Sequence, residues 1–435
     1  MNAREVAFEV VRDVFGPELR GAQAAFDARA RRAGLDARDR AFAAELAYGS
    51  IKQRRLIDWY LKPYLGSREK PLPPAILEVL RLGVYQVRFA SGTSDHAAVS
   101  ETVNLAWRHG HRGTAGLVNA VLRRMLADGP LEPDAADFAS DNDYAGVRFS
   151  VPTWVAAQFG RSYDGARNAA LAGVNSAPQH ALRVNTLRAE AIDVAAELAE
   201  RGVTARPSPY VGETLVLDSG SVGDDPAGRW TIQGEAAAMP VDLLAPQPGE
   251  TVLEFCGGRG NKTLQLAART GGLGSVVTVE LDEKKIRVMR DQLARSGVEN
   301  VAVVHGDARE TAAEVRAGAV LLDAPCSGLG VIGRHPEARW RKTPGDGARL
   351  AVAQDELLRA AAIRTASGGR LVYSVCSSDP REGSERIDAF LAEDHAFSRS
   401  PLPERYAPFA RDGDLVVPAG IEGRDGFYIA SLVRS

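Results

Sequence analysis

Apolar runs with strand character alternate with helical segments from about residue 236 to the end, and this alternation restricts the possible folds most. Helical spacing fills the gaps, for example over 282–295 and 351–365. Strands that alternate with helices predict a parallel, doubly wound sheet, that is, a Rossmann-like α/β domain. Such a sheet binds ligands at the carboxyl ends of its strands. The predicted strands are Thr251–Phe255, Ser275–Glu280, Val301–His305, Ala319–Asp323, Arg370–Ser374 and Phe427–Val433.

The preceding part of the chain divides into two regions. Apolar residues recur at three- and four-residue intervals through residues 1–128, which predicts helices throughout. Residues 129–145 contain Gly129, Pro130 and Pro133 and several aspartates, which is typical of a linker. Strand-like runs near 181 and 214 flank a helical segment over 189–200. Four aromatic residues are expected in the core of the helical region: Trp59, Tyr60, Tyr85 and Trp107.

These patterns predict a chain of several domains, because domains usually span about 100–200 residues. We expect an all-α domain over 1–130, a small α/β linking domain over 131–235 and the α/β domain over 236–435. No stretch approaches the ~18–20 apolar residues of a membrane span. The N-terminus also lacks the apolar segment of a signal peptide. The sequence therefore predicts a cytoplasmic protein without a membrane partner.

Charge is unevenly distributed along the chain. Residues 1–130 hold 20 Lys and Arg against 14 Asp and Glu. The whole chain holds 53 and 56, which leaves 33 basic and 42 acidic residues for the remainder. A basic N-terminal third beside an acidic body indicates a polyanionic partner for that third. Arginine-rich helices that are simply well solvated explain the same distribution equally well.

The chain has three cysteines, Cys256, Cys326 and Cys376. An odd and sparse set argues against a disulfide framework, and no pair has the spacing of a zinc site, so no metal is expected. A free cysteine is most often a small buried residue. All three nevertheless follow predicted strands of one sheet, where structural cysteines have no reason to gather. Cys326 also follows Asp323 closely, so a carboxylate and thiols are expected to face the ligand crevice together.

A glycine-rich segment follows the first predicted strand of the α/β domain. Glycines after a strand let the backbone turn tightly and approach a ligand closely. Glu280 ends the next strand, 20 residues after Gly260, where an acid accepts hydrogen bonds from ribose hydroxyls. Asp307, at the end of the third strand, can accept from an adenine amino group or cap a helix. The pattern fits a nicotinamide cofactor or S-adenosylmethionine equally, and a tight turn without a ligand has the same signature.

Taken together, these motifs resemble the bacterial cytosine-C5 ribosomal RNA methyltransferases of the Sun type, which carry an N-terminal NusB-like domain. The resemblance covers nearly the whole length of the chain. It rests on motifs in all three predicted domains: Leu35–Arg40, Glu45–Gly49, Leu80–Gln86, His96–Glu101, Val118–Arg124, Leu182–Leu187, Asp323–Cys326, Arg334–Glu337 with Trp340, Cys376–Ser377 and Asp425–Tyr428.

The resemblance implies a catalytic mechanism. It implies that Cys376 is the nucleophile that adds to carbon 6 of cytosine and that Cys326 assists release of the product. Asp323 is implied to hold the N3/N4 edge of the base and to protonate N3, with Lys262 near the same pocket. It implies S-adenosylmethionine as cofactor and RNA as partner, with 16S ribosomal RNA or a small-subunit precursor as substrate, and we expect a monomer. The implied cofactor shell is Cys256, Gly257, Gly258, Arg259, Gly260, Asn261, Lys262, Glu280, Asp307 and Asp323.

One motif departs from the family pattern, which usually reads Asp-x-Cys-Ala-Ala-Pro-Gly-Gly-Lys-Thr. This chain has Glu254 in place of the aspartate, Gly257 and Gly258 in place of the alanines, Arg259 in place of the proline and Asn261 in place of the second glycine. Asparagine tolerates a left-handed conformation, so we expect the turn to form with Asn261 in that role. Losing the proline makes the loop less rigid.

Three other functions compete with an active RNA cytosine-C5 methyltransferase. The first is a catalytically weakened RNA-binding scaffold with a degenerate cofactor loop, in which the basic helical domain carries the function. An amino-group methyltransferase is a second, but that class usually has an aromatic residue after a proline, where this chain has Cys326. The third, a nicotinamide-dependent dehydrogenase, leaves the paired thiols unexplained.

Overall fold

The computed structural model describes residues 1–66 and 71–435. The chain forms two compact units. Unit 1 comprises Met1–Gly160 and Arg334–Lys342, and unit 2 comprises Arg161–Gly333 and Thr343–Ser435. Among the described residues, no helix combines the length and the apolar character needed to cross a membrane.

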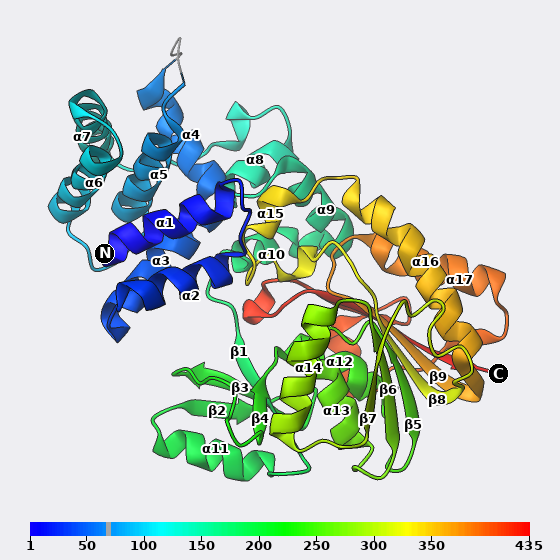
Figure 1. Cartoon of the computed structure of the whole chain (residues 1–435). Coiled ribbons are helices and arrows are strands. Elements are labelled where there is room, and N and C mark those ends of the chain that lie inside the picture. Colours follow the sequence, from blue (N-terminus) through cyan, green and yellow to red (C-terminus); the bar gives the residue numbers. More distant parts are fainter. Residues whose placement is uncertain (67–70) are drawn as a thin grey trace. The chain divides into compact units, whose positions relative to one another are not determined.

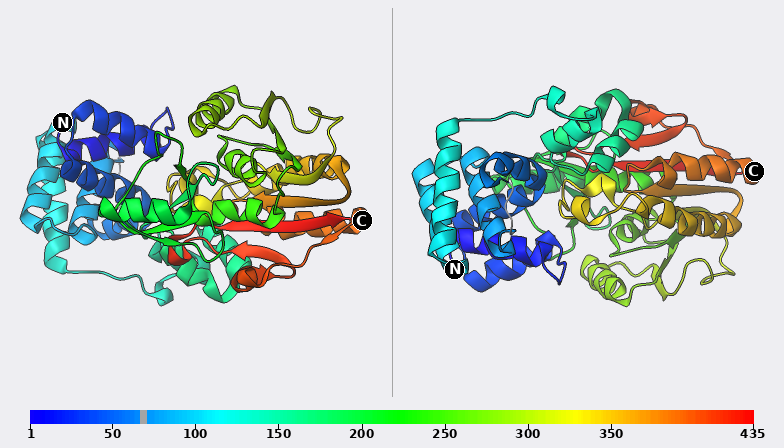
Figure 2. Two further views of the ribbon diagram at one scale, coloured as in Figure 1. Left: turned by 90° about the horizontal axis from the view of Figure 1, so that it is seen from below. Right: turned by 90° about the horizontal axis from the view of Figure 1, so that it is seen from above.

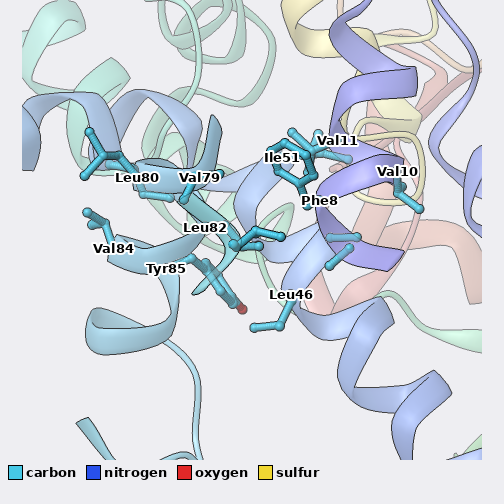
Figure 3. Packing of buried hydrophobic residues seen from close by; sticks show 14 of the residues in the cluster. Phe8, Val10, Val11, Leu46, Ile51, Val79, Leu80, Leu82, Val84 and Tyr85 are labelled. Atoms are coloured by element: carbon cyan, nitrogen blue, oxygen red, sulfur yellow. The ribbon is translucent and has the colours of Figure 1, made fainter. Parts of the chain in front are cut away.

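Unit 1 is helical, as predicted (Figure 1). Its large hydrophobic core is built mainly from the first seven helices. Figure 3 shows side chains of this core from three of them, among them Phe8, Ile51 and Leu82. The helices are α1 (Ala3–Phe15), α2 (Ala22–Ala33), α3 (Ala37–Lys52), α4 (Arg54–Leu65), α5 (Pro74–Arg88), α6 (Asp95–His109), α7 (Arg112–Asp128), α8 (Asp141–Arg148) and α9 (Thr153–Tyr163). The sequence boundary between the two units, after Gly160, falls within α9.

Local sequence accounts for the helix starts in unit 1. At the beginning of α1, Asn2 accepts from the backbone N–H of Glu5, and the Glu5 side chain accepts from that of Asn2, so both orphan donors are satisfied. Pro74 begins α5, where its missing N–H costs no hydrogen bond. Tyr60 and Tyr85 are buried as predicted. The core assignment of Trp107 is wrong, because this side chain is 51% exposed on α6.

The segment expected to be a linker is partly helical. Ser140 accepts from the backbone N–H of Asp143 and so caps α8. Ala145 and Val147 of α8 are buried, and Val147 belongs to the core of unit 1. The prediction of a linker over 129–145 is therefore wrong for residues 141–145. Their aspartates lie in the first turn of α8, where negative charge stabilises a helix.

Residues 334–342 lie between two segments of unit 2 in the sequence but fold as part of unit 1. They include the short helix α15 (Ala338–Arg341). The Trp340 ring packs against the core of unit 1, and its Nε1 donates to the carbonyl of Ile51 at 2.8 Å. Arg339 is fully buried beside it, and its guanidinium donates to the carbonyls of Lys52 and Ser150. Specific hydrogen bonds thus hold this segment within unit 1.

Unit 2 begins with helix α10 (Arg167–Gly173) and a small antiparallel sheet in the order β2-β3-β1-β4. Strands β1 (His180–Val184) and β3 (Thr214–Ser219) and helix α11 (Ala191–Glu200) match the predicted segments. Strands β2 (Thr204–Pro207) and β4 (Trp230–Ile232) were not predicted. Both are short and lie at the two edges of the sheet, where pairing is needed on one side only.

The remainder of unit 2 contains a nine-stranded sheet with the order β11-β12-β13-β9-β8-β5-β6-β7, and β10 pairs with β13. The five adjacent strands β9, β8, β5, β6 and β7 are parallel, as predicted, and β13 adds antiparallel to β9. The strands are β5 (Thr251–Phe255), β6 (Ser275–Glu280), β7 (Val301–His305), β8 (Ala317–Asp323), β9 (Thr365–Val375), β10 (Phe397–Arg399), β11 (Ala410–Arg411), β12 (Asp414–Val417) and β13 (Phe427–Arg434).

Helices cover both faces of this sheet, as a doubly wound fold requires (Figure 1). On one face the core contains side chains of α12 (Glu235–Leu244), α13 (Asn261–Arg269) and α14 (Glu283–Ser296). On the other it contains those of α16 (Asp346–Arg364) and α17 (Ser384–Glu393). Figure 2 shows the strands and helices of this unit from two further sides. With both faces covered, the carboxyl ends of the parallel strands form the free edge at which a ligand can bind.

Candidate active site

Three parallel strands bring all three cysteines to one edge of the large sheet. Asp323 of β8 lies opposite Ser374 of β9, and Phe255 of β5 lies opposite Leu322 of β8. Cys256 directly follows β5, and Cys376 directly follows β9, while Cys326 lies in the loop after β8. The sequence-based placement of the three cysteines at strand carboxyl ends is therefore confirmed.

The Sγ atoms of Cys326 and Cys376 lie 3.3 Å apart. Backbone hydrogen bonds connect the loops that carry them: the N–H of Ala324 donates to the carbonyl of Ser374 at 2.9 Å, and that of Gly330 donates to the carbonyl of Cys376 at 3.1 Å. The two thiols thus form a close pair on neighbouring, mutually bonded loops.

Two of the thiols, Cys256 and Cys326, have raised pKa values. The hydrogen bond with Cys376, together with burial, raises the pKa of Cys326 well above its ordinary value. Burial raises the pKa of Cys256 to about 12. Cys256 and Cys326 are therefore thiols at neutral pH. Since the thiolate is the nucleophile in cysteine chemistry, neither is suited to attack a carbon atom directly.

An ion pair lies at the same strand ends. Lys262, in the first turn of α13, donates from Nζ to Oδ2 of Asp323 at 2.8 Å. The other oxygen of Asp323 accepts from the Ser374 hydroxyl at 2.7 Å. Burial opposes the charge on Lys262, but Asp323 outweighs this effect and raises the Lys262 pKa. The structure therefore brings four predicted site residues, Cys326, Cys376, Asp323 and Lys262, to one edge of the sheet.

The glycine loop between β5 and α13 is sterically fitted to a close backbone approach. Cys256, Gly258 and Gly260 all have positive φ angles, of 62°, 61° and 92°. A Cβ atom on Gly257 would lie 2.1 Å from Oγ1 of Thr278, and one on Gly260 would lie 2.6 Å from Cγ of Met289. A Cβ on Gly258 would meet only the carbonyl oxygen of Cys256, at 3.9 Å, which is ordinary van der Waals contact. The backbone at Gly258 thus borders open space, which is what a bound nucleotide cofactor requires.

The two predicted acids near this loop are already hydrogen bonded. Oε2 of Glu280 accepts from the N–H of Gly258 at 2.8 Å, and Oε1 accepts from that of Asp282 at 2.9 Å. Glu280 therefore shapes the loop itself and keeps lone pairs for further donors. Asp307 accepts from the N–H of Arg309 at 2.9 Å and also pairs with the Arg309 side chain. Its carboxylate is engaged locally, so access to Asp307 depends on Arg309.

Comparison with known proteins agrees with this arrangement in each of three regions of the chain. A family model described as 16S rRNA methyltransferase RsmB/F matches residues 241–433, one for the NusB family matches residues 1–127, and one for a ferredoxin-like domain of RsmF/B-like methyltransferases matches residues 151–222. The ribosomal RNA small subunit methyltransferase B of Thermus thermophilus is 36% identical, over 95% of this chain and 93% of that protein. The chain belongs to the 16S rRNA methyltransferase RsmB/F family.

Other relatives extend the comparison. The ribosomal RNA small subunit methyltransferase B of Pseudomonas putida is 32% identical, over 92% of both chains. The crystal structure of PH0851 superposes with a TM-score of 0.81 at 26% identity and covers 99% of both chains. The predicted fold, a NusB-like helical region followed by a small α/β domain and a Rossmann-like methyltransferase domain, is thereby confirmed.

In this RsmB/F family member the altered first motif still forms a turn, but a different residue from the one predicted takes the left-handed conformation. Asn261 is the first residue of α13 and has no positive φ angle, so the expectation that it supplies the left-handed residue is wrong. Gly260, directly before the helix, takes that conformation instead. The exposed Arg259 occupies the position of the usual proline, and the turn forms without it.

Arg183 is a site-supporting residue that the sequence analysis missed. It lies on β1, is fully buried, and burial lowers its pKa to about 10. Its Nη2 donates to the carbonyl of Asn261 at 3.1 Å, and its Nε donates to Oε1 of Gln233 at 2.7 Å. The ferredoxin-like sheet therefore holds the point where the glycine loop enters α13. An arginine inside the apolar run Ala181–Val184 was the available signal.

Glu254, the acid of the first motif, is fully buried at the end of β5 and accepts from the Thr263 hydroxyl at 2.6 Å. Burial raises its pKa from 4.5 to about 7. The folded state thus favours the protonated acid, and stability falls as pH rises from about 4.5 through about 7. We expect Glu254→Gln to remove this loss and to be more stable than wild type at pH 8 by about 3 kcal/mol. Urea unfolding of both proteins at pH 5 and pH 8 measures the difference.

The exposed Glu299 on the same unit provides the control for this experiment. A Glu299→Gln variant removes the same charge from a solvated position and should follow the wild-type pH profile. Equal stability of Glu254→Gln and wild type at pH 8 would show that burial does not hold the Glu254 proton.

Proposed function

We propose that this protein transfers a methyl group from S-adenosylmethionine to carbon 5 of a cytosine in 16S ribosomal RNA, through a covalent adduct with Cys376. The observation that carries the proposal is the pair of thiols, 3.3 Å apart, at the same strand ends as the Lys262–Asp323 ion pair. Ribosomal RNA as the substrate class agrees with the family membership and with relatives named ribosomal RNA small subunit methyltransferase B.

The residues around the glycine loop fit S-adenosylmethionine. Gly258 leaves its backbone open, the loop is held by Glu280, and both features suit a ligand with ribose hydroxyls. When bound there, the cofactor supplies an electrophilic methyl group. The residues that would hold it are those predicted from the sequence: Cys256, Gly257, Gly258, Arg259, Gly260, Asn261, Lys262, Glu280, Asp307 and Asp323.

Carbon 5 of cytosine is a poor nucleophile until carbon 6 carries an added group. The Cys376 thiolate forms a bond to carbon 6, and the electron pair of the C5=C6 bond becomes available at carbon 5. We assign the nucleophile to Cys376 because the family resemblance implies it, and the raised pKa of Cys326 agrees with a different role for that thiol. This assignment gives the two neighbouring cysteines different roles.

The remaining groups handle protons. Asp323, held by Lys262 and Ser374, is positioned to bind the N3/N4 edge of the base, and the Lys262–Asp323 pair supplies the proton at N3. After methylation, solvent water accepts the carbon-5 proton, and the C5–H electron pair restores the C5=C6 double bond as the Cys376–C6 bond breaks. Cys376 leaves as the thiolate, assisted by a hydrogen bond from the Cys326 thiol, and N3 returns its proton to the Lys262–Asp323 pair. The base and both thiols are thus regenerated for another cycle.

The target cytosine must leave its stack to reach the strand ends. We assign RNA binding to the proposed helical domain, residues 1–130, and the linking domain, residues 131–235, with chemistry in residues 236–435. The excess of basic residues in 1–130 supports the first assignment. We also propose that the protein acts as a monomer, which analytical ultracentrifugation tests directly.

Product analysis tests the proposed reaction. The purified protein is incubated with S-adenosylmethionine carrying a labelled methyl group and with unmodified 16S ribosomal RNA, which is then digested to nucleosides and analysed by mass spectrometry. We expect label only in 5-methylcytidine. Label in N4-methylcytidine or in a ribose-methylated nucleoside would overturn the assigned chemistry.

Calorimetry of S-adenosylmethionine binding separates an enzyme from an RNA-binding scaffold, because it needs no RNA. We expect saturable binding by the wild-type chain that is lost in Glu280→Ala, since Glu280 holds the loop. A well-folded chain that binds RNA but not the cofactor would favour the scaffold.

A further inference from the structure

A fully buried carboxylate, that of Glu382, lies behind the two catalytic loops. Glu382 ends a short 3-10 helix, Pro380–Glu382, that follows Cys376 in the chain. Its Oε2 accepts from the hydroxyls of Ser327 and Ser377, each at 2.5 Å, and its Oε1 accepts from the N–H of Ser327 at 2.8 Å. Ser327 directly follows Cys326, and Ser377 directly follows Cys376. One carboxylate therefore binds the residue next to each thiol.

Further contacts fix the position of this carboxylate. The Tyr373 hydroxyl donates to the backbone carbonyl of Glu382 at 2.6 Å. From α16, Gln354 donates to Oε1 of Glu382 at 3.3 Å and to the carbonyl of Pro325 at 2.9 Å. The hydroxyls of Ser327 and Ser377 lie 3.0 Å from each other. Glu382 is thus anchored to β9 through its backbone carbonyl and to α16 through its carboxylate, which leaves it little freedom to follow a loop that moves.

We propose that Glu382 is a positioning residue that keeps Cys326 and Cys376 within contact distance and places a negative charge behind Cys326. Its carboxylate accepts from Ser327, Ser377 and Gln354, so it acts on the thiols through Ser327 and Ser377. The inference deepens the proposed function and rests on it, because it explains how one of two adjacent thiols remains reserved for releasing the adduct.

The carboxylate of Glu382 contributes a negative charge as well as hydrogen bonds. Burying a carboxylate is costly unless donors satisfy it, and this one has four. Its negative charge adds to the burial and the hydrogen bond that raise the pKa of Cys326. A neutral side chain of the same shape would hold the serines but would not disfavour a second negative charge beside them. Position and charge can therefore be separated experimentally.

Thiol alkylation tests the inference without RNA or cofactor. Iodoacetamide is added to the full chain over a range of pH, and mass spectrometry measures the modification of each cysteine. In Glu382→Gln, which removes the charge, we expect the pH profile of Cys326 to shift down by about one pH unit or more. In Glu382→Ala we expect diamide to oxidise the Cys326–Cys376 pair about tenfold more slowly, as expected for losing hydrogen bonds to a charged acceptor.

The exposed Glu385 of α17 supplies the matched control. A Glu385→Gln variant removes one negative charge three residues away and should leave both thiol readouts as in wild type. If Glu382→Ala does not fold, the isosteric Glu382→Gln variant decides the question by itself. A folded Glu382→Gln protein whose Cys326 profile matches wild type overturns the inference.

The consequence for turnover is measured separately. In an RNA assay we expect the adduct of Glu382→Ala to form and then to break down about tenfold more slowly than in wild type, because release needs a correctly placed Cys326. Altered thiol profiles without any methyl transfer by the wild-type protein would overturn the proposed function while leaving the inference about Glu382 intact. Unaltered adduct breakdown, with normal methyl transfer, would overturn the positioning role.

Discussion

Cys376→Ala and Cys326→Ala are expected to fail in opposite ways. Without its nucleophile, Cys376→Ala should form no covalent RNA adduct and should lose methyl transfer by about 10,000-fold or more. In Cys326→Ala the nucleophile remains, so the base is still attacked and methylated. Release is then impaired, and a Cys376–RNA adduct should accumulate that survives denaturing gel electrophoresis in the presence of S-adenosylmethionine.

The close approach of the two sulfur atoms is the reason why this experiment is needed to assign their roles. Because they lie only 3.3 Å apart, either thiol could reach the same base atom, so proximity does not assign their roles. The trapped adduct assigns the roles, because the variant that accumulates it must retain the nucleophile and lack the releasing group. A double Cys326→Ala/Cys376→Ala variant is the control and should trap nothing. An adduct that accumulates in Cys376→Ala and not in Cys326→Ala would reverse the two roles.

Three of the five parallel strands could be predicted from the sequence to the residue, whereas β8 and β9 begin two and five residues earlier than predicted. The bounds of β5, β6 and β7 equal the predicted ones. The central strands β5 and β6 are largely buried and appear as mostly apolar runs, and the edge strand β7 has a similar run although it is only partly buried. The strands β2, β4, β10, β11 and β12 were missed. They have two to four residues each, and their pairing depends on partners elsewhere in the chain.

The candidate site divides in the same way. Cys326, Cys376, Asp323 and Lys262 could be predicted because each follows or ends a recognisable strand or begins a helix. Glu382 could not be predicted, because its partner Ser327 lies 55 residues earlier and only the folded sheet brings them together. One signal was present: both cysteines are followed by serine, in Cys326-Ser327 and Cys376-Ser377. A repeated dipeptide at two strand ends indicates a shared partner only after the strand order is known.

The Lys262–Asp323 pair allows stability and catalysis to be separated, and this is the second large effect that we expect. Lys262 is almost completely buried, so removing its partner in Asp323→Leu leaves an uncompensated charge and should destabilise unit 2 by about 3 kcal/mol. The double variant Lys262→Met/Asp323→Leu removes both charges. It should recover most of that stability, because a buried ion pair can often be replaced by apolar side chains at little net cost.

Activity should not recover with stability. Both single variants and the double variant should lose about 100- to 10,000-fold in kcat/KM, the usual range for removing a group that transfers or stabilises a proton. Thermal unfolding and methyl transfer measured on the same four proteins complete the cycle. A double variant that regains activity along with stability would mean that the pair only holds α13 against β8. A stable but inactive double variant would place the pair in the chemistry at N3, where protonation must accompany attack by Cys376.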